Sequence, residues 1–122
     1  MISGKKIPFI NENANMRKAF KLITEKKLGV LIAINKNKVT TGIITDGQIR
    51  RSSQKNNTLV ELSVKKIMTK NPISVDKDML AVKSLSIMSE KKITSLCVHK
   101  KNSPKKTIGI LHIHNILDGN VS

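Results

Sequence analysis

The strongest constraint on the fold is an internal repeat, in which one order of segments occurs twice within 122 residues. Each copy has a proline-led extended segment, a helical pattern, an apolar run and a segment that begins with Gly. Corresponding positions are Ile10 with Val75, Lys27 with Lys92 and Gly42 with Gly109. The spacing is constant until the loop at 100–107, where the second copy gains two residues. Agreement in order and spacing over about fifty residues indicates two copies of one structural unit.

Apolar residues at helical spacing predict one amphipathic helix early in each copy. The positions are Met16, Ala19, Phe20 and Ile23 in the first copy and Ala81, Leu85 and Met88 in the second. They follow the i, i+3, i+4, i+7 pattern of a helix with one buried face. The side-chain oxygen of Asn13 or Asn15 can cap the first helix, and that of Asp76 or Asp78 can cap the second.

Apolar runs predict two strands after each helix. Residues 30–34 and 96–98 are almost continuously apolar, which is typical of strands that are buried on both faces. The second strands are expected at 39–45 and 107–111, and short closing helices at 46–53 and 114–117. The predicted order is β-α-β-β-α, twice, which is an α+β fold.

A polar linker at 52–57 separates the copies. We therefore place the first repeat at residues 1–57 and the second at 58–122, with a short capped helix around 63–69 leading into it. Half of this chain buries too little apolar surface to be stable alone, so the repeats are expected to share an interface.

The net charge of +15 raises the hypothesis of nucleic-acid binding, since clustered Lys and Arg release counterions from phosphates. The lysines, however, are spread over both halves, and Phe9 and Phe20 are the only aromatic residues. No aromatic platform for stacking bases is interleaved with the charges. A solvated basic surface is therefore favoured over a nucleic-acid partner.

Composition also predicts a cytoplasmic location without a membrane span. No apolar run approaches the roughly 20 residues that cross a bilayer, and the N-terminus lacks the apolar stretch of a signal peptide. Cys97 is the only cysteine, so no intrachain disulfide can form. It stands in an apolar strand, where an inert core thiol is favoured over a nucleophile.

Two segments resemble CBS (cystathionine-β-synthase) domains. Residues 64–75 read Val-Lys-Lys-Ile-Met-Thr-Lys-Asn-Pro-Ile-Ser-Val, which resembles the opening signature of such a domain. Residues 42–46 read Gly-Ile-Ile-Thr-Asp, which resembles the end of one. The resemblance covers essentially the whole chain. It implies two repeats packed about a pseudo-twofold axis in a sandwich-like α/β arrangement, two ligand clefts between them, and a homodimer formed through the helices.

A narrower resemblance points to arabinose-5-phosphate isomerases, which join a sugar-isomerase domain to a C-terminal CBS pair. Residues 42–51 resemble their Thr-Asp-Gly-Asp-Leu-Arg-Arg segment, and residues 1–8, 79–82 and 109–117 resemble other parts of that subfamily. The resemblance implies that the chain is the C-terminal part of a longer protein, or a stand-alone descendant of it, without the catalytic domain. The parent would interconvert ribulose 5-phosphate and arabinose 5-phosphate for Kdo and lipopolysaccharide synthesis.

The nucleotide-binding pattern of CBS pairs is Thr or Ser followed three residues later by Asp, whose carboxylate accepts hydrogen bonds from the ribose hydroxyls. Here Gln48 follows Thr45 at that spacing. In the second copy His112 replaces the hydroxyl residue and Asn115 replaces Asp. An amide binds a hydroxyl without the strength that a charge adds, so these departures weaken the prediction of an adenosine nucleotide.

Other polar residues complete the expected site. The expected ligand-binding residues are Gly29, Thr45, Asp46, Gln48, Arg50, Arg51, Lys70, Asn71, Thr94, Ser95, His112 and Asn115. Arg50 and Arg51 can bind an anion, or can face solvent as a pair at a helix C-terminus. His112 and His114 are too few for a zinc site, so no metal is expected.

Three functions remain open. The first is a regulatory module, not itself an enzyme, that binds a small anionic metabolite such as a nucleotide or sugar nucleotide between the repeats and acts on an attached isomerase domain. The second is a structural pair that dimerises and has lost its ligand, which the missing Asp residues suggest. The third is a nucleic-acid-binding domain, for which charge is the only argument.

Overall fold

The computed structural model describes residues 2–55, 58–79 and 81–113. The chain forms two compact units. The first unit is Pro8–Pro72, and the second combines Met1–Ile7 with Ile73–Ser122. These units differ from the predicted repeats, 1–57 and 58–122. Residues 58–72 belong to the first unit, and residues 1–7 belong to the second.

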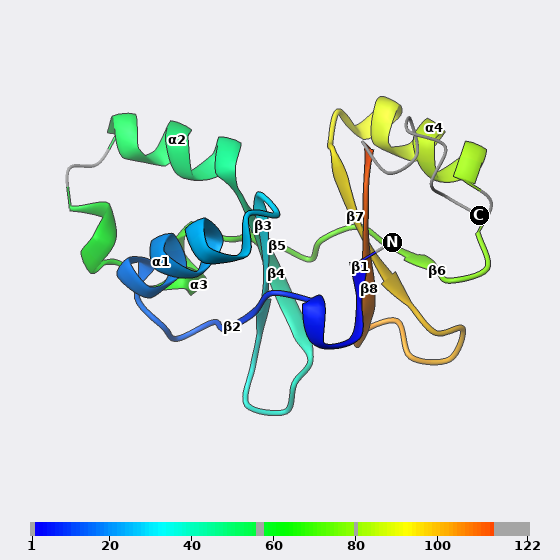
Figure 1. Cartoon of the computed structure of the whole chain (residues 1–122), viewed down its shortest axis with the longest axis horizontal. Coiled ribbons are helices and arrows are strands. Elements are labelled where there is room, and N and C mark those ends of the chain that lie inside the picture. The colour runs from blue at the N-terminus through cyan, green and yellow to red at the C-terminus, as the bar shows by residue number, and fades with distance from the viewer. Residues whose placement is uncertain (1, 56–57, 80, 114–122) are drawn as a thin grey trace. The chain divides into compact units, whose positions relative to one another are not determined.

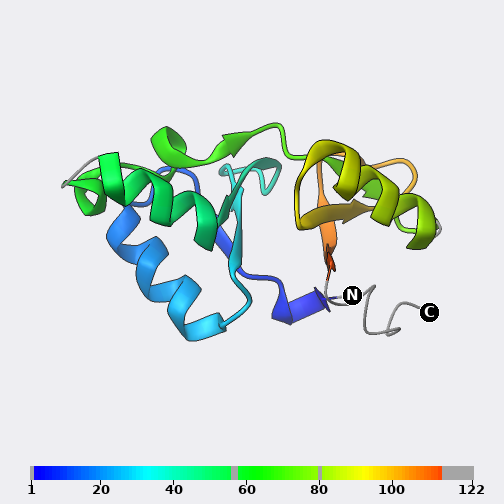
Figure 2. The ribbon, with the colours of Figure 1, turned by 90° about the horizontal axis from the view of Figure 1, so that it is seen from above.

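The first unit has a four-stranded sheet in the order β2-β3-β4-β5. Its strands are β2 (Phe9–Asn11), β3 (Val30–Ile34), β4 (Thr40–Thr45) and β5 (Thr69–Lys70). Its helices are α1 (Met16–Lys26), α2 (Asp46–Lys55), the 3-10 turn η2 (Leu59–Glu61) and α3 (Val64–Ile67). Strand β2 is parallel to β3, and the other neighbouring strands are antiparallel. Figures 1 and 2 show α1 and α2 on the same side of this sheet.

Helix α1 confirms the predicted apolar face. Met16, Ala19 and Ile23 are buried, and Phe20 packs half-buried against the same core. Asn15 is the cap, since its side-chain oxygen accepts a hydrogen bond from the Lys18 amide at 3.0 Å. The alternative cap, Asn13, instead donates its amide to the Asn11 side chain at 2.8 Å, in a turn before the helix.

The segment that leads to the second repeat is hydrogen-bonded to the first unit. The Met16 amide donates to the Leu62 carbonyl at 2.8 Å, and the Val64 amide donates to the Ala14 carbonyl at 2.7 Å. The Lys65 amide also donates to the Glu12 carbonyl at 2.8 Å. These bonds tie residues 62–65 to the start of α1, which explains why the first unit extends to Pro72.

The second unit has a sheet in the order β1-β8-β7-β6. Its strands are β1 (Ile2–Ser3), β6 (Ser74–Asp76), β7 (Ser95–His99) and β8 (Thr107–His112), with the 3-10 turn η1 (Gly4–Lys6) and the helix α4 (Ala81–Lys91). Val75, Met88, Leu96, Val98 and Leu111 form its buried apolar cluster. Strand β1 pairs antiparallel with β8, which places residues 1–7 in this unit.

The predicted order of elements is confirmed in the first repeat, and in the second repeat as far as β8. The helix expected at 114–117 lies outside the described residues. The cap expected from Asp76 is wrong, because its carboxylate accepts from the Asp78 amide at 2.9 Å in a turn that precedes α4. None of the helices in the described ranges is long and apolar enough to cross a membrane.

Candidate functional site

The first unit brings Gly29, Thr45 and Asp46, three of the expected site residues, together at one end of its sheet. Strand β3 begins where β4 ends, because Val30 pairs with Thr45. The Asp46 amide donates to the Gly29 carbonyl at 3.0 Å. Gly29 has a φ of 71°, and a Cβ at this position would lie 3.2 Å from an oxygen of the Asp46 carboxylate. Only glycine therefore fits here without strain.

Thr45 and Gln48 are the residues that the CBS resemblance aligns with the hydroxyl and carboxylate of the nucleotide-binding pattern. The Thr45 hydroxyl accepts a hydrogen bond from the Gln48 amide at 3.2 Å and so caps α2. The Gln48 side chain donates its Nε2 to the carbonyl of Ile67. Since the side-chain nitrogen Nε2 is bonded within the unit, the side-chain oxygen of Gln48 is the atom that can accept a hydrogen bond from a ligand hydroxyl.

Both signs of charge lie near the first turn of α2. The exposed Asp46 carboxylate is at the positive end of the helix dipole. Arg51 folds back along the helix, because a Cβ on Gly47 would lie 3.3 Å from its Nη1. Arg50 and Arg51 are exposed, but α2 continues to Lys55. The reading of these arginines as a pair at the C-terminus of the helix is therefore wrong.

Lys70 and Asn71 lie elsewhere in the first unit. Strand β5 pairs Lys70 with Gly42, three residues before Thr45 on β4. At about 3.3 Å per residue, this register separates the Cα atoms of Lys70 and Thr45 by roughly 10 Å along the sheet. The side chains of Lys70 and Asn71 are exposed, and Asn71 has a φ of 52°. The unit does not gather them with Gly29 and Asp46.

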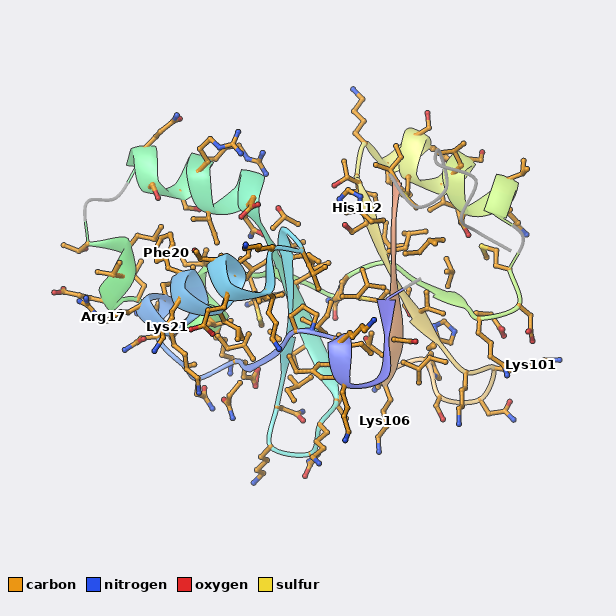
Figure 3. All side chains as sticks on the ribbon, viewed as in Figure 1. Arg17, Phe20, Lys21, Lys101, Lys106 and His112 are labelled. Carbon is orange, nitrogen blue, oxygen red and sulfur yellow. The ribbon has the colours of Figure 1, made fainter. Side chains whose placement is uncertain are left out.

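The second unit repeats the backbone arrangement of the first. The Ile113 amide donates to the Thr94 carbonyl at 2.8 Å, as the Asp46 amide does to Gly29. Ser95 pairs with His112, and Figure 3 shows His112 at the opposite end of this unit from Lys101 and Lys106. Thr94 is exposed, Ser95 is buried and His112 is half-buried. Asn115 and His114 lie outside the described residues.

Sequence reasoning missed one polar pair. His99 is half-buried, and its Nδ1 lies 2.6 Å from the Ser74 hydroxyl. Ser74 and His99 come from neighbouring parallel strands, β6 and β7. Their contact depends on strand register, which no local pattern specifies.

The interpretation of Cys97 as a core thiol is confirmed. Its side chain is fully buried, and burial raises the pKa of the thiol although a hydrogen bond with Thr107 lowers it. Among the described residues, no group of three or more His, Cys, Asp or Glu side chains is placed to hold a metal ion.

Comparison with known proteins agrees with this geometry. The sequence profile of the CBS domain matches residues 2–55 and 64–121. The arabinose 5-phosphate isomerase KdsD of Salmonella typhi is 33% identical over 121 residues, which are 99% of this chain and 36% of that protein. The uncharacterised protein RP505 of Rickettsia prowazekii is 34% identical over 100% of this chain and 37% of its own length. The chain thus spans about a third of the curated relatives that it matches.

Solved structures show the same fold. The CBS-domain-containing protein ATU1752 from Agrobacterium tumefaciens has a TM-score of 0.85 at 16% identity, covering 94% of this chain and 90% of that one. The CBS domain protein PAE2072 from Pyrobaculum aerophilum, complexed with AMP, has a TM-score of 0.82 at 17% identity, covering 92% and 84%. The profile match, the relatives and the fold agree, and the chain belongs to the CBS domain family as a tandem pair.

Proposed function

We propose that this chain is the regulatory, ligand-sensing CBS pair of an arabinose-5-phosphate isomerase-like protein. The observation that carries the proposal is the 33% identity to KdsD across 99% of the chain. In the proposed parent, an isomerase domain interconverts ribulose 5-phosphate and arabinose 5-phosphate in the cytoplasm for Kdo and lipopolysaccharide synthesis. The CBS pair is not the catalyst but changes the isomerase through a bound metabolite, which requires different affinities in two states.

The proposed ligand is a small anionic metabolite, such as a nucleotide or a sugar nucleotide. Two solved members of the fold bind adenosine compounds, the anion AMP in PAE2072 and S-adenosyl-L-methionine in MJ0100. In this chain, the Thr45 hydroxyl and the Gln48 side-chain oxygen stand at the start of α2, and the Arg51 guanidinium lies over the same turn. Arginine suits a phosphate, whereas an amide in place of Asp lowers the expected affinity for ribose hydroxyls.

A thermal-shift experiment tests the ligand. AMP, ATP, a CMP-linked sugar and arabinose 5-phosphate are each added at saturating concentration, and a ligand that binds the folded state at 100 times its Kd adds about 2.7 kcal/mol of stability. Arg51→Ala is expected to remove most of the shift. Arg17→Ala, an exposed position on α1 (Figure 3), is the matched control and is expected to retain it. If none of the four compounds raises the melting temperature, the sensing role is contradicted.

The parent is tested by the gene itself. An open reading frame that continues upstream of the Met1 codon and encodes a sugar-isomerase domain supports a covalent parent. If the frame is closed, co-purification with a separately encoded isomerase tests a module that acts in trans. Failure of both experiments contradicts the isomerase connection but leaves the ligand test valid.

A structural role is the second candidate, and one observation favours it. The Gln48 side chain donates to the Ile67 carbonyl, so the residue that replaces the ligand-binding Asp serves the internal packing of the first unit. In this role the pair dimerises through its helices and binds no metabolite. Light scattering on the purified chain tests this candidate, and a monomer at all concentrations would exclude it.

A further inference from the structure

Helix α4 carries a buried polar group that its counterpart in the first repeat lacks. Ser84 is 1% exposed, and its hydroxyl has no hydrogen-bond partner in the part of the chain that the structure describes. The residue at the corresponding position of α1 is Ala19, which is fully buried. A buried hydroxyl without a partner loses its hydration and gains no bond in return, so Ser84 weakens the packing of α4 on its sheet.

The sequence just before α4 also differs from that before α1 at the position of the cap. Asn15 caps α1 through its side chain, and the Met16 amide donates to the Leu62 carbonyl at 2.8 Å. The sequence has Leu80 at the position that corresponds to Asn15, and a leucine side chain cannot accept a hydrogen bond. A helix without a side-chain cap loses about 1 kcal/mol relative to a capped one.

The outer face of α4 adds a third difference. Val82 is 80% exposed, although it is apolar and its β-branched side chain is a weaker helix former than most. Arg17 stands at the corresponding position of α1, where it is exposed to water. Val82, the second residue of α4, therefore contributes little to the stability of the helix or of its packing on the sheet.

The C-terminal ends of the two helices do not explain the difference. Each helix is followed by a lysine with a left-handed backbone conformation. Lys27 after α1 has a φ of 55°, and Lys92 after α4 has a φ of 57°. The Ile93 amide donates to the Met88 carbonyl at 3.0 Å, which completes a hydrogen-bonded end for α4. The features that weaken α4 are therefore Ser84 on its buried face and Val82 on its exposed face.

We infer that α4 is a conformational switch element, which opens from its sheet before the rest of the second unit unfolds, and that Ser84 sets the ease of this opening. Opening exposes the apolar residues that α4 covers, such as Leu96 and Val98 on β7. A helix with docked and open states is a two-state element on which a ligand or partner can act. The inference goes beyond the proposed function and does not depend on it.

Native-state hydrogen exchange on the whole chain tests this inference. In the unmodified protein, the interior amides of α4 are expected to exchange faster than those of α1 and those of β7. Ser84→Ala is expected to slow the exchange of the α4 amides about tenfold, because it removes the unpaired hydroxyl, and to change the β7 amides less.

Two further variants make the test specific. Ser86→Ala changes the same residue type at an exposed position of α4, so it reports the gain in helix propensity alone. Ala19→Ser places a hydroxyl at the matching buried position and is expected to speed exchange in α1. Equal protection of α4 and α1 in the unmodified protein would overturn the inference. An effect of Ser84→Ala no larger than that of Ser86→Ala would also overturn it.

Discussion

Gly42 shows how one residue of the central strand depends on a distant side chain. A Cβ at Gly42 would lie 2.3 Å from the sulfur of Met68 and 2.6 Å from its Cγ. Met68 is buried, and its sulfur also lies 4.0 Å from the Thr41 hydroxyl. The close approach of β4 to the Met68 side chain therefore requires glycine at this position.

Gly42→Ala is accordingly expected to destabilise the protein by about 1–3 kcal/mol, the usual cost of overpacking a core. Urea denaturation measures the change. Met68→Ala makes room, so the double variant is expected to lose less stability than the sum of the two single variants. Gly47→Ala is the control: among the described residues, the atom that its Cβ would approach is the flexible Arg51 head at 3.3 Å, so this change is expected to be neutral or stabilising. Additive single changes would contradict the predicted clash.

Cys97 predicts a pH dependence of stability. Burial raises the pKa of its thiol in the folded state, so the folded state holds the proton to higher pH than the unfolded chain does. Below the unfolded pKa of about 8.5, both states are protonated and the thiol contributes no slope. Above that pH, only the unfolded state loses its proton, and stability falls as pH rises.

Comparison with Cys97→Ala isolates this effect from the titration of the lysines. Between pH 7 and pH 10, the free energy of unfolding is expected to fall more steeply for the unmodified protein, by up to about 1.4 kcal/mol per pH unit. Chemical denaturation at several pH values measures both proteins. Parallel profiles would show that the thiol ionises equally in the folded and unfolded states.

At the scale of elements, a single substitution at the C-terminal end of α4 is expected to stabilise the protein. Lys92 has a φ of 57°, a conformation that glycine adopts without cost and that other residues adopt with strain. Lys92→Gly is expected to raise the free energy of unfolding by about 0.5–1 kcal/mol, measured by urea denaturation. Lys83→Gly, at an exposed position within α4, is expected to lower it by about 1 kcal/mol. A loss of stability in Lys92→Gly would contradict the strain argument.

The two repeats build the same elements with different local chemistry. Each repeat has an Asx turn before its first helix, from Asn11 in one copy and from Asp76 in the other. In the first repeat a side-chain cap, Asn15, follows this turn. The corresponding position in the second repeat, Leu80, lies outside the described residues. Patterns of apolar residues predicted both helices because burial of one face, rather than the cap, contributes most of the stability of a helix in a protein.

At the scale of the whole molecule, charge is the dominant feature. The sequence holds 23 Lys and Arg residues against 8 Asp and Glu residues, so a compact state brings many like charges together. At physiological ionic strength, salt strongly weakens the repulsion between charges that lie more than about 8–10 Å apart. The melting temperature is expected to rise when KCl is raised from 10 to about 200 mM.

A change of buffer to one of equal osmolarity, with sucrose in place of KCl, controls for effects that do not depend on charge. A melting temperature that is insensitive to KCl would show that the lysines lie too far apart to repel one another. Strong binding of short DNA at the same salt concentration would instead support the nucleic-acid hypothesis, which the absence of aromatic platforms disfavours.

Much of the fold and part of the candidate site could be read directly from the residues. The repeat, the order of strands and helices and the buried faces follow from spacing along the chain, because a strand alternates and a helix turns every 3.6 residues. The positions of Gly29, Thr45 and Asp46 next to one another follow from the pairing of two consecutive strands. These are local relations, and local relations are what a pattern records.

Relations between distant segments were decided only by the folded chain. The pairing of residues 1–7 with β8, the bond from Gln48 to the Ile67 carbonyl and the contact of Ser74 with His99 join parts that no periodicity connects. The burial of Ser84 without a partner is of the same kind. Each depends on strand register and on which side chains fill a shared interior, and these are set by the packing of the whole unit rather than by its individual segments.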